Sequence, residues 1–328
     1  MNSFLENYLK ENPDLVAAGI KTHSAALRHY IRFGIHENRV SSSFDSHIYL
    51  HNYPDLSLAG ITTPRAALNH YLRFGIREKR VAHRCTNKVF DLKINRVPQK
   101  HLNFKVSKVL VKLPESVDLR QRLPPCYDQG SIGSCTANAL VAAYQLIKPE
   151  FMGSRLFLYY NERVLEKTTA IDAGAYLYDG VKSLINNGVC AETDWPYTKK
   201  FNLKPTAICY TRALDHQVLA AKNVVQSLDQ MKQCLADGFP FVVGILVYSP
   251  FLSTTTSKTG VVTMPLAKDR LLGGHAILIV GYLETTRQWI FRNSWGTKWG
   301  ANGYGYLPYD YLVSTKLSSD LWTINVVE

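Results

Sequence analysis

Three short segments, far apart in the chain, contain the residue types needed for acyl transfer through a thioester. The segments are DQGSIGSCTANAL around Cys135, GGHAILIVGY around His275 and WIFRNSWGTKWG around Asn293. A thiolate attacks a carbonyl, an imidazole takes up and returns the proton, and an amide oxygen orients the imidazole. We therefore predict a Cys135 nucleophile, with His275 as its ion-pair partner and general acid and Asn293 as the orienting group.

The elements expected around these residues would hold the three groups rigidly. The apolar run 135–147 has helical spacing, which places the sulfur of Cys135 at a helix N-terminus, where partial positive charge stabilises an anion. The run 275–282 is apolar after its first residue and predicts a buried strand that begins at His275. Asn293 ends a second short predicted strand, WIFRN.

Two further side chains complete the expected site. Gln129 precedes a glycine-containing turn, and its side-chain NH₂ is expected to bind the developing oxyanion together with the backbone N–H of Cys135. Trp295 is expected to cover the hydrogen bond between His275 and Asn293 and to keep water away from it.

These motifs, in the order Cys, His, Asn, resemble those of the papain-like cysteine peptidases, which include the cathepsins. Cys135 and His275 are 140 positions apart, within the roughly 130–150 that is typical of that family. The resemblance extends from LPESVDLR, which begins at Leu113, to the end of the chain. It implies that Gln129, Cys135, His275 and Asn293 are the oxyanion-binding glutamine, the nucleophile, the base and the orienting asparagine.

The same resemblance implies an α+β fold, with a helical lobe and a β-barrel-like lobe that face each other across a cleft. A helix-rich part follows Cys135, and a strand-rich part near Phe241 includes FPFVVGILV, TGVVTMP, HAILIVGY, QWIFRN and GYGYLPYDYL. The family's substrate-binding positions map onto Gly174, Ala175, Leu177, Gly244, Gly274, Ala276 and Trp295. Most of these side chains are small or apolar, which favours an apolar substrate residue at P2.

The chain departs from the family at Ile132 and Asp172, which stand where the family has the two halves of a disulfide, and at Thr136, which replaces a tryptophan. None of the six cysteines has the CxxC or CxH spacing of a metal site, and the resemblance implies no cofactor. The lost bridge and the absence of a secretory signal predict a reducing compartment, the cytoplasm or a virion, without structural disulfides. No apolar stretch approaches the length of a membrane span.

Residues 1–81 contain an internal repeat with a period of 41, in which Tyr30 pairs with Tyr71 and Gly34 with Gly75. Each unit reads as two short helices, the second with Thr22 or Thr63 as N-cap. The pattern resembles short helical repeats attached to enzymes of giant DNA viruses. We therefore expect three parts: all-α repeats at 1–81, a basic linker or propeptide-like segment at 82–112, and a papain-like domain at 113–328.

The formal net charge of +12 is concentrated in the N-terminal third. Residues 1–112 contain 18 Lys and Arg against 8 Asp and Glu, and residues 84–112 contain eight basic residues and one acidic residue, Asp91. Such a segment could contact an anionic partner or an acidic face of its own catalytic domain, or it could be a solvated linker. Two repeats are few to bury their own apolar faces, so we expect residues 1–112 to dock on the catalytic domain or on a partner.

These observations favour a cysteine endopeptidase that hydrolyses proteins or peptides, made as a zymogen whose N-terminal region gates or targets it. The same triad could also perform transpeptidation. One alternative is a catalytically weak binding or scaffold protein that uses the basic N-terminal third. Another alternative is a protein that binds nucleic acid through that basic third.

Overall fold

The computed structural model describes residues 8–10, 12–34, 44, 46, 49–50, 53–75, 78, 80, 90, 92–93 and 112–327. The chain divides into two compact units, Met1–Lys88 and Val89–Glu328. Most of the basic segment 84–112, including Cys85, lies outside the described residues. No helix in the described ranges is both long and apolar enough to cross a bilayer.

The first unit contains the same short elements in both copies of the repeat. They are α2 (Pro13–Ala17), α3 (His23–His29) and η1 (Tyr30–Gly34), then α5 (Pro54–Leu58), α6 (Pro64–His70) and η2 (Tyr71–Gly75). Thr22 Oγ1 accepts from Ala25 N and Thr63 Oγ1 accepts from Ala66 N, both at 3.2 Å. In each copy a tyrosine hydroxyl meets a histidine Nδ1, Tyr8 with His29 at 3.0 Å and Tyr49 with His70 at 2.9 Å.

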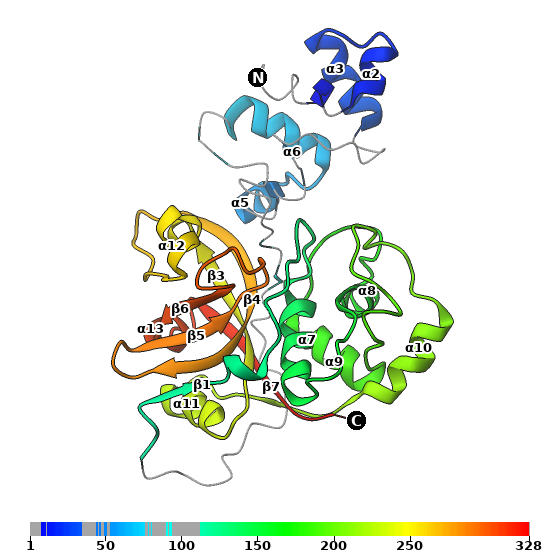
Figure 1. Ribbon diagram of the computed structural model, residues 1–328. Helices are drawn as coiled ribbons and strands as arrows, with labels where there is room; N and C mark the ends of the chain where they lie inside the picture. The colour runs from blue at the N-terminus through cyan, green and yellow to red at the C-terminus, as the bar shows by residue number, and fades with distance from the viewer. Residues whose placement is uncertain are drawn as a thin grey trace. The chain divides into compact units, whose positions relative to one another are not determined.

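The second unit begins with a group of helices (Figure 1). They are α7 (Cys135–Ile147), α8 (Arg155–Leu165), α9 (Leu177–Asn186) and α10 (Ala207–Ala213), with the short turns η3 (Arg120–Arg122) and η4 (Leu214–His216). Helix α7 is buried over nearly its whole surface because it packs against α8 and α9 on one side and against β3, β4 and β7 on the other. A helix enclosed in this way keeps its first residue in a fixed position.

The strands of this unit form one antiparallel sheet, drawn in yellow to red in Figure 1 apart from β1 and β2. The sheet order is β2–β7–β3–β4–β5–β6, and β1 pairs with β4. Its strands are β1 (Ser116–Asp118), β2 (Val218–Asn223), β3 (Phe241–Tyr248), β4 (Leu271–Leu283), β5 (Gln288–Arg292), β6 (Tyr304–Pro308) and β7 (Ser318–Val327). The remaining elements of the second unit are α11 (Leu228–Ala236), α12 (Thr254–Thr259), α13 (Tyr309–Val313) and the turn η5 (Ser249–Leu252).

Successive side chains along the central strands point to opposite faces of the sheet, so the apolar core has one part on each face. On β4, Ala276, Leu278 and Val280 pack into the cluster that contains α7. Ile277 and Ile279 pack into a second cluster, which contains Trp289, Phe291, Trp295 and Trp299. Because side chains of a strand alternate with period two, the register of β4 decides which side chains face α7 and which face the aromatic cluster.

Three of the strand predictions are wrong in detail. The strand expected to begin at His275 is β4, which begins at Leu271. GYGYLPYDYL is a strand only as far as Pro308, after which residues 309–313 form α13. Proline has no N–H to donate to a sheet, and its fixed φ suits the position just before a helix. TGVVTMP contributes only an isolated bridge between Val261 and Tyr306.

Candidate active site

Helix α7 begins at Cys135, as predicted, so the sulfur stands at the N-terminus of a 13-residue helix. Cys135 is fully buried and packs in the same apolar cluster as Ala276 and Leu278 of β4. The helix that carries the thiol therefore lies directly against the strand that carries His275.

The imidazole of His275 is held by Asn293. His275 Nε2 donates to Asn293 Oδ1 at 2.8 Å, and the same oxygen accepts from Ser294 N at 2.9 Å. The ring of Trp295 lies 5.1 Å from that of His275, centroid to centroid. His275 and Asn293 are both buried, so their hydrogen bond is shielded from water. With its proton on Nε2, the ring has Nδ1 available to exchange a proton with a thiol or an amine.

Gln129 is fixed from two sides. Its backbone N donates to Ser294 O at 2.9 Å, and its Oε1 accepts from Ser294 Oγ. Its Nε2 donates to Ile132 O at 2.8 Å, within the loop that leads to Cys135. A side-chain amide carries two N–H donors, so one remains for an oxyanion beside the sulfur.

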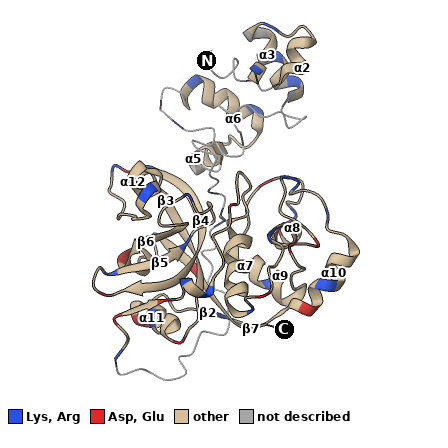
Figure 2. Cartoon of the chain, in the orientation of Figure 1, with Lys and Arg blue, Asp and Glu red and all other residues tan. Residues whose placement is uncertain are grey.

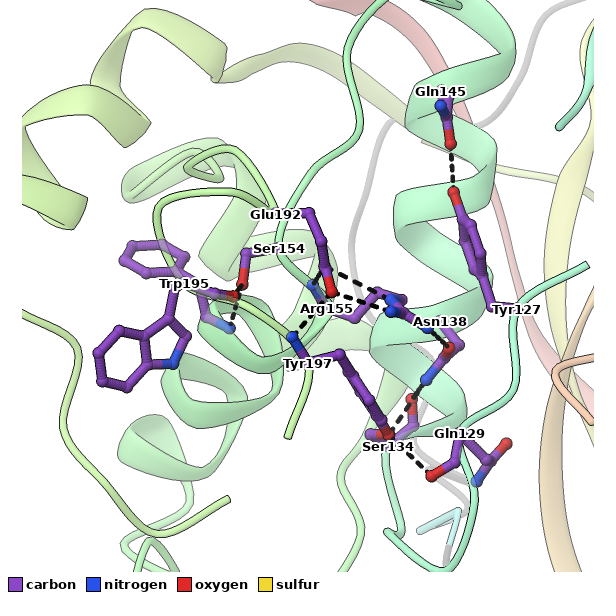
Figure 3. Close-up of polar contacts among 11 residues, drawn as sticks. Tyr127, Gln129, Ser134, Asn138, Gln145, Ser154, Arg155, Glu192, Trp195 and Tyr197 are labelled. Atoms are coloured by element: carbon purple, nitrogen blue, oxygen red, sulfur yellow. Dashed lines mark hydrogen bonds and ion pairs between the residues drawn. The ribbon is translucent and has the colours of Figure 1, made fainter. Parts of the chain in front are cut away.

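A buried polar network holds the loop ahead of Cys135 (Figure 3). Tyr197 Oη donates to Gln129 O at 3.0 Å and meets Ser134 Oγ at 2.5 Å. Asn138 Nδ2 donates to Ser134 O at 2.8 Å. Behind them, Arg155 forms an ion pair with Glu192 at 2.9 Å, and its guanidinium lies 4.2 Å from the centroid of the Tyr197 ring. These contacts hold the loop from Gln129 to Ser134 and the start of α7 in fixed positions relative to each other.

Asp172 forms a second link, at the position where the family has half of a disulfide. Its carboxylate accepts from Gly133 N at 3.0 Å and from Tyr159 Oη at 2.6 Å. Tyr159 Oη in turn accepts from Gly174 N at 3.1 Å. The carboxylate therefore joins the Cys135 loop to the Gly174–Ala175 loop by hydrogen bonds, across the gap that the family bridges with sulfur.

Several of the residues mapped as substrate-binding positions are contacted by Leu92 and Lys93, which belong to a segment of the same chain whose residues 90, 92 and 93 are described. Leu92 N donates to Gly274 O and Lys93 N donates to Ala175 O, both at 3.1 Å. The Leu92 side chain occupies the predicted apolar pocket, because a Cβ added at Gly244 would lie 2.7 Å from Leu92 Cδ2 and 3.9 Å from Leu177 Cδ1. Leu92 is only 3% exposed.

Phe90 lies over the catalytic side of the cleft. Its ring is 6.1 Å from that of His275 and 5.6 Å from that of Trp295, in edge-to-face arrangements. A Cβ at Gly273 would lie 2.5 Å from Phe90 O, so the two backbones are in close contact. The segment thus passes over the imidazole as well as over the substrate positions.

Three of the other described cysteines have thiols with a raised pKa. Burial raises the pKa of Cys126, of Cys190 and, to about 12, of Cys234. These thiols stay protonated at neutral pH and are unreactive. In the described parts of the chain the cysteines are free thiols, and no cluster of His, Cys, Asp or Glu could hold a metal ion.

Sequence reasoning named the catalytic group and the cleft positions, and it missed several residues that hold them. Tyr159, Glu166, Tyr197 and Ser294 were not singled out, since no motif marks a tyrosine or glutamate that acts through the backbone of a distant loop. Asp172 was noticed only as a missing cysteine. The replacement of both half-cystines, by Ile132 and Asp172, was the signal that something else must join the two loops.

Comparison with known proteins identifies the family. The family model described as "Papain family cysteine protease" matches residues 113–319. The chain belongs to this family. It is a papain-like cysteine protease, and the predicted α+β papain-like fold is confirmed.

Relatives of this papain-family chain are found in several kingdoms. An uncharacterised peptidase C1-like protein of Acanthamoeba polyphaga mimivirus is 39% identical over 257 residues, which cover 74% of this chain and 80% of that protein. The cathepsin B-like CP3 of Giardia intestinalis is 29% identical over 58% of this chain and 68% of its own length. The crystal structure of xylellain, a cysteine protease from Xylella fastidiosa, is 37% identical with a TM-score of 0.70, and the match covers 76% of this chain and all of that one.

Proposed function

We propose that this papain-family chain is an endopeptidase that uses Cys135, His275, Asn293 and Gln129 in the roles expected from the sequence. The observation that supports this most is the buried 2.8 Å bond from His275 Nε2 to Asn293 Oδ1, on the strand that packs against the start of α7. This bond selects the tautomer that a general base beside a thiol requires.

In the proposed reaction, the Cys135 thiolate attacks the peptide carbonyl and forms a tetrahedral intermediate. The backbone N–H of Cys135 and the Gln129 side chain donate hydrogen bonds to the oxyanion. His275 Nδ1 gives its proton to the departing amine, which breaks the C–N bond and leaves a thioester on Cys135. His275 then takes a proton from a water, whose oxygen attacks the thioester; the C–S bond breaks, the carboxylic acid product leaves, and the Cys135 thiolate and protonated His275 are restored.

Labelling with an epoxide thiol reagent tests this assignment. We expect one equivalent of label on Cys135 and loss of peptide hydrolysis in proportion to labelling. Cys126, Cys190 and Cys234 should stay unlabelled, because burial raises the pKa of each thiol. Label on another cysteine, with hydrolysis lost in step, would overturn the assignment.

We also propose that residues 1–112 control access to the cleft, with Phe90, Leu92 and Lys93 among the residues that block it. Leu92 in the apolar pocket, Phe90 beside His275 and the backbone bonds to Gly274 and Ala175 support this directly. A peptide substrate would need the same pocket and the same carbonyl groups, so segment and substrate compete.

Two comparisons test the gating proposal on one fluorogenic peptide. A chain that begins at Leu113 should exceed the full chain in kcat/KM and in the rate of Cys135 labelling. In the full chain, Leu92→Asp should raise both rates by about 10- to 100-fold, because burying a leucine side chain is worth about 1.5–3 kcal/mol. Leu266→Asp is the matched control, since Leu266 is 60% exposed. Equal rates in all four proteins would leave targeting as the better account of the N-terminal region.

The mimivirus relative suggests, as a proposal only, that the protein acts in a viral context. The N-terminal repeats of this chain would then target the enzyme to a partner protein or to a virus particle. Retention of the full chain on DNA at low salt, lost at high salt, would favour an anionic partner.

A further inference from the structure

The Lys93 side chain occupies a place in the cleft that neither the catalytic group nor the apolar pocket explains. Its backbone N donates to Ala175 O at 3.1 Å, and residues 93 and 176 form a parallel bridge. The side chain extends over Tyr176, with Nζ 5.7 Å from the ring centroid, and forms an ion pair with Glu166 Oε2. A cation therefore lies one residue along from the leucine in the apolar pocket.

Glu166 is held ready for such a cation by the fold itself. It caps the C-terminus of α8, and its Oε1 accepts from Tyr176 N at 2.8 Å, which leaves Oε2 directed at Lys93. The Glu166 side chain is 6% exposed and that of Lys93 is 22% exposed. Breaking a pair this enclosed by removing one partner is costly, because the remaining charge stays desolvated.

The charges around this pair are mixed. Asp179 on α9 lies near enough that burial, followed by the charge of Glu166, raises its pKa, while Lys182 and Lys93 act in the opposite direction. Glu162, one turn before Glu166, is fully buried, and its burial raises its pKa well above the ordinary value. Figure 2 shows that both signs of charge are otherwise distributed over the helices of this unit.

We propose that Glu166 and Tyr176 form a specificity subsite that takes a Lys or Arg side chain of the substrate, next to the residue in the apolar pocket. This inference rests on the proposed peptidase function. When Leu92 and Lys93 leave the cleft, Glu166 keeps its bond to Tyr176 N and loses its cation. A substrate residue with a flexible stem and a positive end would restore the pair, and the Tyr176 ring would lie beneath it.

The rival reading is that Glu166 anchors only the blocking segment and has no part in choosing substrates. The two readings differ in what the open cleft binds. If Glu166 is an anchor alone, Lys93→Gln should speed turnover of every peptide equally. If it is a subsite, the same variant should turn over basic peptides faster than their neutral counterparts.

The experiment uses the full chain carrying Lys93→Gln. Fluorogenic peptides hold Leu at the residue for the apolar pocket, and each neighbour of that Leu is varied in turn among Lys, Arg, Gln and Glu. We expect kcat/KM for Lys or Arg at one of these positions to exceed that for Gln by about 10-fold, since hydrogen bonds between charged groups are stronger than those between neutral ones. Adding Glu166→Gln should abolish the preference, and adding Glu166→Lys should reverse it toward Glu.

Asp179→Asn in the same background is the matched control, because it removes a nearby negative charge without removing the carboxylate that pairs with Lys93. The preference should survive it. Equal kcat/KM for Lys, Arg and Gln peptides, with turnover that depends on Cys135, would overturn the subsite and leave the peptidase proposal intact.

Absence of Cys135-dependent turnover both in this variant and in a Leu92→Asp, Lys93→Gln chain, whose apolar pocket is open, would count against the peptidase proposal instead. Equilibrium binding would then test the subsite. The same Lys and Gln peptides would be bound to the Cys135→Ala, Lys93→Gln chain, with binding measured by fluorescence anisotropy. Tighter binding of the Lys peptide that vanishes with Glu166→Gln supports the subsite, and equal binding of the two peptides refutes it.

Discussion

The two walls of the cleft position their reactive groups by different physical means. On the helical wall, buried polar side chains reach across loops, as in the contacts of Tyr197 with Gln129 and of Asp172 with Gly133. On the sheet wall, which is formed by β3, β4 and β5, His275 pairs with Ile245 of β3. Aromatic rings surround its imidazole, and those of Phe251 and Trp295 are among them.

The difference follows from the elements that each wall contains. A strand in the middle of a sheet has every backbone group paired and needs only apolar packing to fix its side chains. A loop that leads into a helix has few backbone partners, so side chains must supply the hydrogen bonds. Arg163 shows this clearly, because it is fully buried and donates to Thr169 O at 3.0 Å and to Ile171 O at 3.1 Å, bracing the loop that follows α8. We therefore expect the helical wall to respond to loss of single polar groups and the sheet wall to loss of packing.

The largest effect is expected at the start of α7. Cys135→Ala should abolish peptide hydrolysis and leave the melting temperature nearly unchanged, because the thiol is the only nucleophile of the site and its removal takes away one buried atom. Turnover and thermal unfolding, measured together, check both parts. Cys234→Ala is the control, since that thiol is also fully buried, and it should keep full activity. Wild-type turnover in the Cys135 variant would show that the nucleophile lies elsewhere.

A smaller loss is expected from the sheet wall. Asn293→Ala should lower kcat by roughly 10²-fold, at the low end of the range for general acid–base groups, because packing against Trp295 and Phe251 still holds the imidazole. KM should change little. A loss as complete as that of Cys135→Ala would mean that hydrogen bonding, rather than packing, positions groups on this wall too.

Asp172→Ala tests the helical wall directly. Loss of the acceptor for Gly133 N and Tyr159 Oη should cost about 1–3 kcal/mol of unfolding free energy. It should also reduce kcat/KM, because the loops of Cys135 and of Gly174 lose their link. Asp172→Asn keeps one acceptor oxygen and should recover part of both losses, while Asp215→Ala at an exposed site should change neither. Denaturant unfolding and kinetics on the same preparations would show whether stability and activity move together, and unchanged values in Asp172→Ala would break the comparison.

The smallest effect concerns pH and Glu162. Burial raises the pKa of this carboxyl well above its ordinary value of 4.5, and Thr136 Oγ1 donates to its Oε2 at 2.7 Å. The folded protein therefore keeps the proton over a range in which the unfolded chain releases it. Stability from this group is full below about pH 4.5 and decreases as the pH rises toward the folded pKa.

Glu162→Gln should remove that decrease and raise the melting temperature at pH 7 by a few degrees, since 1 kcal/mol corresponds to roughly 2–4 °C for a chain of this size class. Glu150→Gln, at an exposed site, should leave the profile unchanged. Thermal unfolding from pH 4 to pH 8 gives the comparison. A wild-type stability that rises across this range, with the same rise in the Gln variant, would refute the buried-acid account.

Much of the site could be read from local sequence. The run after Cys135 predicted the helix, which begins at the expected residue, and the run after His275 predicted the strand, which begins earlier, at Leu271. Sequence patterns were less informative where one residue type fits two structures. GYGYLPYDYL has strand composition throughout, yet the proline divides it into a strand and a helix.

The amino-acid sequence by itself determined the chemistry of this protein, because thiol, imidazole and amide occur in motifs whose residues are neighbours in the chain. Only the tertiary structure decided what fills the cleft and what braces it. Lys93 and Glu166 are 73 positions apart, and Gly133 and Asp172 are 39 apart. Such pairs leave no period or motif in the sequence, because they meet only after the helices and the sheet have packed together.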